Sequence, residues 1–117
     1  MAVSDPIRTY AVTVRGFDAL LYSARSPGKA RARCYRDYGN YDDRCTFAEF
    51  MKISGVRLAE SPEGIGGRHL VAGKPATRVV DGNKGRDAGN RLLFMYDDSD
   101  DIVCAHPSEI QPLPEGK

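Results

Sequence analysis

The sequence predicts an α+β protein in which an N-terminal β-β-α-α-β unit is followed by a small SH3-like β-barrel. Apolar residues alternate near the N-terminus, which is typical of strands, and two helix-start signals follow. Beyond a segment rich in Gly and Pro at residues 60–67, short strand patterns and turns remain. We therefore expect residues 1–60 and residues 61–117 to form the two parts, which could also join into one compact fold.

The N-terminal segment predicts a β-hairpin. Between residues 8 and 17, the apolar side chains Tyr10, Val12 and Val14 alternate with smaller or polar ones, which is the period of a half-buried strand. A turn and a second apolar run at residues 20–22 follow, so the two segments can pair. A return strand is expected later, at residues 56–59.

Two helices are predicted between these strands. The Ser26 hydroxyl can accept a hydrogen bond from a free first-turn amide, and Pro27 loses no bond at the first helical position, so a helix is expected over residues 26–38. Thr46 and Glu49 have the spacing of a capping box, which predicts a second, shorter helix. The apolar residues of this helix are expected to point inward: Phe47, Phe50, Met51 and Ile53.

The second half of the chain predicts a closed or nearly closed barrel. Five short strand patterns lie at residues 69–71, 76–80, 91–96, 102–105 and 110–113. A long glycine-containing loop at residues 81–90 and an acidic hairpin at residues 97–101 separate some of them. Several short strands in about 50 residues are typical of small barrels.

The overall composition argues against a general electrostatic role. The chain has 17 Lys and Arg against 16 Asp and Glu, so any affinity for nucleic acid must come from a local patch. An odd count of 3 cysteines and an N-terminus without a secretion signal predict a reducing, cytoplasmic location. No apolar run approaches the roughly 18 to 20 residues of a membrane span, so no membrane partner is expected.

The first predicted helix carries a basic stripe. At 100° per residue, Ala30, Cys34 and Tyr38 share one face. The opposite stripe holds the candidate nucleic-acid-binding residues Arg25, Lys29, Arg33 and Arg36. Three further cations around the mobile loop are expected to assist them: Lys84, Arg86 and Arg91. The alternative interpretation is an ordinary solvated helix face, which nearby aspartates partly neutralise.

Other candidate sites are weaker. Cys104 and His106 share one strand face and could bind one metal ion, with Cys34, Cys45 or His69 as further zinc ligands. The chain has no Cys-x-x-Cys pair, so we expect no metal site and interpret the cysteines as small buried hydrophobes. The aspartates of residues 97–101 lack the pattern of a calcium loop. We expect no cofactor and no enzymatic activity.

The order of several short motifs resembles that of a family of small uncharacterised proteins encoded by tailed bacteriophages and prophages of proteobacteria. The motifs, which cover about residues 8–113, are Tyr10-Ala-Val-Thr-Val14, Ala24-Arg-Ser-Pro-Gly-Lys-Ala-Arg31 with Tyr35, Thr46-Phe-Ala-Glu-Phe50, Val56-Arg57 and His106-Pro-Ser-Glu-Ile110. The resemblance implies a phage or prophage product acting in the bacterial cytoplasm. It implies no activity and no functional residues.

These observations lead to three functional hypotheses. The first is a small non-enzymatic binding or adaptor protein whose partner is a host or phage protein. This hypothesis includes the modulation of a host system. SH3-like barrels serve widely as binding platforms, so this hypothesis rests on analogy of fold. The second is nucleic-acid binding through the basic stripe. The third is a structural or assembly component of the virion.

Overall fold

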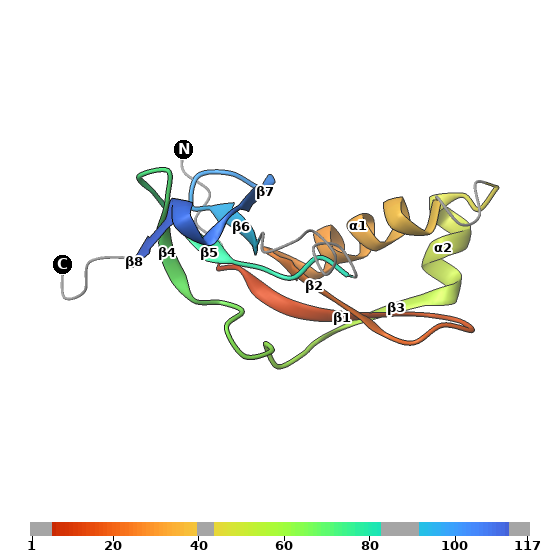
Figure 1. The fold of residues 1–117 in the computed structure, drawn as a ribbon. Coiled ribbons are helices and arrows are strands. Elements are labelled where there is room, and N and C mark those ends of the chain that lie inside the picture. The colour runs from red at the N-terminus through yellow and green to blue at the C-terminus, as the bar shows by residue number, and fades with distance from the viewer. Residues whose placement is uncertain (1–5, 40–43, 83–91, 113–117) are drawn as a thin grey trace.

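The computed structural model of the protein describes residues 6–39, 44–82 and 92–112. It has a mixed α+β fold with two helices and two antiparallel sheets, which confirms the predicted class (Figure 1). The elements in chain order are β1 (Arg8–Val14), β2 (Leu20–Ala24), α1 (Pro27–Gly39), α2 (Phe47–Ile53), β3 (Ser54–Leu58), β4 (Arg68–Val71), β5 (Lys74–Arg78), β6 (Leu92–Tyr96), β7 (Ile102–Ala105), the 3₁₀ turn η1 (Pro107–Glu109) and β8 (Ile110–Pro112).

The first sheet has the strand order β2-β1-β3, with β1 in the centre. Strand β1 pairs with both neighbours in antiparallel register, for example Val12 with Leu20 and with Val56. The alternation along β1 places Tyr10, Val12 and Val14 in one apolar core beneath the helices. Thr9 and Ala11 on the opposite face of β1 are buried as well, so the period identifies the residues of this core but the prediction of a half-buried strand is wrong for Thr9 and Ala11.

Helix α1 lies on this core with its small residues inward. Ala30 and Cys34 are buried in the same core as the ring of Tyr22 from β2, and Cys34 interacts with the Tyr22 hydroxyl. The Tyr22 hydroxyl donates a hydrogen bond to Asp37 Oδ2 at 2.9 Å. Burial raises the pKa of Tyr22, with smaller contributions from Cys34 and Asp37, and burial also raises the pKa of Cys34. Both groups stay protonated at neutral pH and serve the packing of the helix.

Helix α2 begins as predicted but faces differently from the prediction. The Thr46 hydroxyl accepts from the Glu49 amide at 3.2 Å, and the Glu49 carboxylate accepts from the Thr46 amide at 2.9 Å, which confirms the capping box. Phe50 is fully buried, but Phe47 and Met51 are 41% and 43% exposed, so the prediction that both point inward is wrong. The helix has only 7 residues and contacts the sheet along one narrow side.

The second sheet is a curled half-barrel with the strand order β7-β6-β5-β4-β8 (Figure 1). Its core is small and contains Val71, Ala76, Phe94 and Ala105. The turn between β4 and β5 contains Ala72 and Gly73, which both have positive φ, as tight two-residue hairpin turns require.

A short segment after β5 joins the two sheets. The Ser23 amide donates to the Val80 carbonyl at 2.7 Å, and the Gly82 amide donates to the Leu21 carbonyl at 2.7 Å. Residues 80–82 thus line the outer edge of β2, with a bridge between Tyr22 and Asp81. Gly82 has φ +63°, and a Cβ there would lie 2.8 Å from the Tyr22 hydroxyl oxygen, so glycine is required.

Neither helix of the described chain is long and apolar enough to cross a membrane.

Candidate functional site

Arg25, the first candidate nucleic-acid-binding residue, is buried between the two sheets. It precedes Ser26, whose hydroxyl accepts from the Lys29 amide at the start of α1. The Arg25 side chain is only 5% exposed and its Nε lies 3.0 Å from Asp100 Oδ1. Its Nη2 donates to the carbonyls of the β6–β7 hairpin, which are those of Tyr96, Asp97 and Ser99. The expected position on an open helix face is therefore wrong for Arg25.

Lys29 contacts the same acidic hairpin from the first turns of α1. Its Nζ lies 2.6 Å from Asp100 Oδ2, so this carboxylate receives both Lys29 and Arg25. The hydrogen bond from Lys29 lowers the pKa of Asp100, and the charges of Lys29 and Arg25 act in the same direction. Lys29 itself remains exposed.

Arg33 is also largely buried, one turn further along α1. Its Nη1 lies 3.2 Å from Asp81 Oδ1, and its Nη2 donates to the Ser23 carbonyl. Burial lowers the pKa of Arg33, and Asp81 opposes this shift. Arg33 thus binds residues that join the sheets, and its expected place on an open stripe is wrong as well. Arg36, in the last turn, is exposed.

The acidic hairpin is the counterpart of these cations. Besides the two contacts of Asp100, Arg68 Nη2 donates to Asp97 Oδ2 at 2.6 Å, and Lys74 Nζ lies 3.7 Å from Asp98 Oδ2. The hydrogen bond from Arg68 lowers the pKa of Asp97. The sequence shows both the basic stripe and the acidic run, but their contact depends on how the sheets pack. The sequence signal that could have predicted this contact is the presence of a basic run and an acidic run in a chain that is nearly neutral overall.

The remaining candidate residues form no site in the described part of the chain. Lys84, Arg86 and Arg91 lie outside the described residues. The exposed His106 ring accepts from the Ser108 amide at 3.2 Å and caps the 3₁₀ turn, while Cys104 is exposed and Cys34 is buried. Among residues 6–39, 44–82 and 92–112, no group of three or more His, Cys, Asp or Glu side chains could hold a metal ion.

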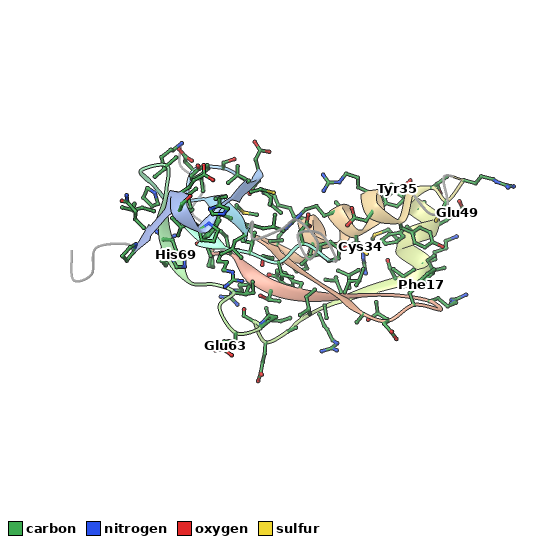
Figure 2. All side chains as sticks on the ribbon, in the orientation of Figure 1. Phe17, Cys34, Tyr35, Glu49, Glu63 and His69 are labelled. Carbon is green, nitrogen blue, oxygen red and sulfur yellow. The ribbon has the colours of Figure 1, made fainter. Side chains whose placement is uncertain are left out.

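Sequence reasoning missed an aromatic row at the helical end of the molecule. Five rings follow one another with centroid separations of 5.1–5.9 Å, in the order Phe17, Tyr38, Phe50, Tyr35 and Phe47. The central ring of Phe50 is fully buried, whereas the terminal rings of Phe17 and Phe47 are 44% and 41% exposed. Figure 2 shows Phe17 and Tyr35 at this end, far from His69. We call the surface formed by Phe17, Tyr35, Tyr38 and Phe47 the aromatic end.

The row could not be read from periodicity because its rings come from three separate elements. Phe17 lies in the β1–β2 turn, Tyr35 and Tyr38 lie on α1, and Phe47 lies on α2. Each ring contacts the next at an edge or tilted geometry, which aromatic pairs prefer. These contacts hold the two exposed rings in fixed positions.

Comparison of the chain with protein-family models, with curated proteins and with solved structures found no match.

Proposed function

We propose that the chain is a small non-enzymatic binding protein that docks on another protein through its aromatic end. The single observation that carries the proposal is the row of five rings with both terminal rings exposed. We further propose that it acts as an adaptor or modulator of a host system in the bacterial cytoplasm, as a phage or prophage product would.

Physical chemistry favours a protein partner for such a surface. Aromatic side chains bury large areas, roughly 150–250 Å² each, and lose little conformational entropy when they bind. They are also enriched among the few interface residues that carry most of the binding energy. The contacts of Phe17 with Tyr38 and of Phe47 with Tyr35 orient the exposed rings before a partner arrives.

The second sheet suits the role of a scaffold in this proposal. We assign it to the SH3-like barrels on the basis of its five short antiparallel strands and its small apolar core. The Arg25–Asp100 ion pair connects this sheet to the start of α1, and the Arg33–Asp81 ion pair connects α1 to the segment after β5. The aromatic end therefore belongs to a molecule with two apolar cores.

Affinity capture with matched variants tests the proposal. The double variant Phe17→Ser/Phe47→Ser is compared with wild type and with Glu63→Ser, an exposed site in the segment before β4. We expect wild type and Glu63→Ser to retain the same protein from a proteobacterial lysate. With that protein purified, calorimetry should show affinity loss of more than about 30-fold for the double variant. Equal affinity for all three proteins contradicts the proposal.

The competing hypotheses are tested with the same preparations. Fluorescence anisotropy with duplex and single-stranded DNA at low salt measures nucleic-acid binding, which the phosphate contribution makes strongest there. Binding that Arg36→Glu weakens would replace the proposed function with the second hypothesis. Large assemblies of wild type in light scattering would favour a virion component.

A further inference from the structure

The first sheet has one edge that the described chain leaves open. Residues 80–82 line the outer edge of β2, and β1 lies in the centre. Within the described ranges, β3 pairs with β1 and with no other strand. An open edge offers unpaired backbone groups to another strand.

The alternation of hydrogen bonds between β1 and β3 shows which residues of β3 have backbone groups that point away from β1. Arg15 donates to the Ile53 carbonyl at 2.8 Å, and Ala59 donates to the Thr9 carbonyl at 2.9 Å. In an antiparallel ladder the bonded residues alternate, so Gly55 and Arg57 also bond to β1. The amides and carbonyls of Ser54, Val56 and Leu58 therefore point away from β1. The Ser54 carbonyl accepts from Arg31 Nη2 at 3.3 Å, and the Ser54 amide belongs to the C-terminal cap of α2, so within the described ranges the groups left open are those of Val56 and Leu58.

Apolar side chains are exposed along the same edge. Leu58 is 57% exposed, the largest fraction among the exposed large hydrophobic residues of the described chain, and Met51 is 43% exposed. Arg31 reaches over from α1, with Nη1 at 3.1 Å from Met51 Sδ, and its buried Nε has no hydrogen-bond partner in the structure. Soluble proteins usually protect an open edge with charge or proline rather than with exposed leucine.

We propose that a second copy of this chain adds its β3 to this edge, antiparallel and about a two-fold axis at Val56. This register uses all five residues of β3 and pairs Val56 with Val56 of the second copy. It places the large Leu58 opposite the small Ser54, and Arg57 opposite Gly55. The result is one continuous sheet of six strands, with the order β2-β1-β3-β3-β1-β2.

Several registers would let the outward backbone groups of the two β3 strands pair. Side-chain sizes and charges select the proposed register among them. A shift by one pair toward Leu58 places the two Arg57 side chains opposite each other, where like charges destabilise the pair. A shift toward Ser54 leaves Leu58 without an opposite residue. In the proposed register Leu58 of the second copy lies beside Ser54, where Met51 and Arg31 meet.

A second copy fits the edge better than an unrelated strand because the match is self-complementary. A two-fold axis brings the same patch of both copies together and closes the assembly at two chains. The Ser54 carbonyl has two lone pairs, so it can accept from Leu58 of the second copy as well as from Arg31. Each copy keeps its aromatic end, so the dimer presents two such surfaces.

Light scattering after size exclusion, over a concentration series of the full chain, measures the association. We expect twice the chain mass of 12.8 kDa for wild type. Leu58→Pro removes an outward amide without removing a bond to β1, so it should weaken the dimer by about 30-fold while the circular dichroism spectrum of the folded chain is unchanged. A strict monomer for wild type, or an equally tight Leu58→Pro dimer, overturns the proposal.

Disulfide cross-linking tests the register. In a background with Cys45→Ser and Cys104→Ser, we introduce Val56→Cys or Arg57→Cys. Facing residues of a bonded pair have Cα atoms about 5.5 Å apart, within disulfide range, whereas two Arg57 positions are offset by two residues and lie beyond about 7 Å. Cross-linking at position 56 and not at 57 is expected. The reverse result excludes the proposed register.

The same variants separate this proposal from the proposed function. Phe17→Ser/Phe47→Ser should still dimerise, and Leu58→Pro should still bind the captured protein at each aromatic end. A monomeric wild type whose captured partner is lost with Leu58→Pro would mean that a strand of another protein occupies the edge. That outcome overturns the second copy as occupant.

Discussion

The Arg25 guanidinium lies 3.0 Å from the Asp100 carboxylate, although the two residues are 75 positions apart. Arg25 begins the connection from β2 to α1, and Asp100 lies in the hairpin between β6 and β7. The contact also brings Arg25 to three backbone carbonyls of that hairpin. Arg25 therefore connects the two sheets of the molecule.

Replacing Arg25 should destabilise the fold strongly. Arg25→Ala leaves three carbonyls of the hairpin without their charged donor, and an unsatisfied buried polar group costs about 1–3 kcal/mol. Urea unfolding followed by circular dichroism measures the loss. Arg36→Ala, on the exposed side of α1, is the control and should change the free energy of unfolding by less than about 0.5 kcal/mol. Similar values for both variants would contradict the role of Arg25.

The acidic hairpin should make stability depend on pH on the acid side. The pKa values of Asp97 and Asp100 are lowered from the ordinary value of 3.8 by bonds from Arg68 and Lys29 respectively. Their contribution is fully present above pH 3.8 and is lost as the pH falls through the lowered values, since the unfolded chain then binds more protons.

Urea unfolding of wild type between pH 7 and pH 2.5 measures this dependence. The double variant Asp97→Asn/Asp100→Asn should be less stable at pH 7 and show a shallower fall below about pH 4. Parallel curves for the two proteins would show that other carboxylates cause the acid sensitivity.

Gly82 should tolerate no side chain. Gly82→Ala combines a positive φ with a Cβ only 2.8 Å from the Tyr22 hydroxyl oxygen, so the segment along β2 must shift. We expect a loss of about 2 kcal/mol or more in thermal or urea unfolding. Gly28→Ala is the matched control, because its nearest atom, Ser26 Oγ, is 4.0 Å away and alanine favours helices. That variant should be neutral or slightly more stable.

Removing the cap of α2 should have a moderate effect. Thr46→Ala removes the acceptor for the Glu49 amide, and loss of such a cap costs about 1 kcal/mol. Urea unfolding measures it, and Thr46→Ser, which keeps the hydroxyl, should restore most of the difference. Equal losses for Ala and Ser would show that the hydroxyl contributes little.

Local signals in the sequence predicted those features that neighbouring residues determine. The start of α1 after Ser26 and the capping box of Thr46 follow from bonds within a few positions. The shared core position of Tyr10, Val12 and Val14 follows from their alternation along β1.

Features that depend on distant segments were not predictable in the same way. The stripe of Arg25, Lys29, Arg33 and Arg36 was placed by helical period alone, but Arg25 precedes the helix and Arg33 faces Asp81. Periodicity cannot reveal a carboxylate that arrives from a sheet formed by later residues. The exposed position of Phe47 was missed for a related reason, because a helix of 7 residues has few neighbours to cover it.

The segment of residues 80–82 along β2 has a consequence for fragments of the chain. A fragment that ends near residue 60 would lose this cover of β2 and the carboxylates of Asp81 and Asp100. Each half would then carry part of an interface for the other half. Fragments 1–60 and 61–117, produced separately, should be poorly folded alone and should recover structure when mixed, as the parts of a split reporter protein do.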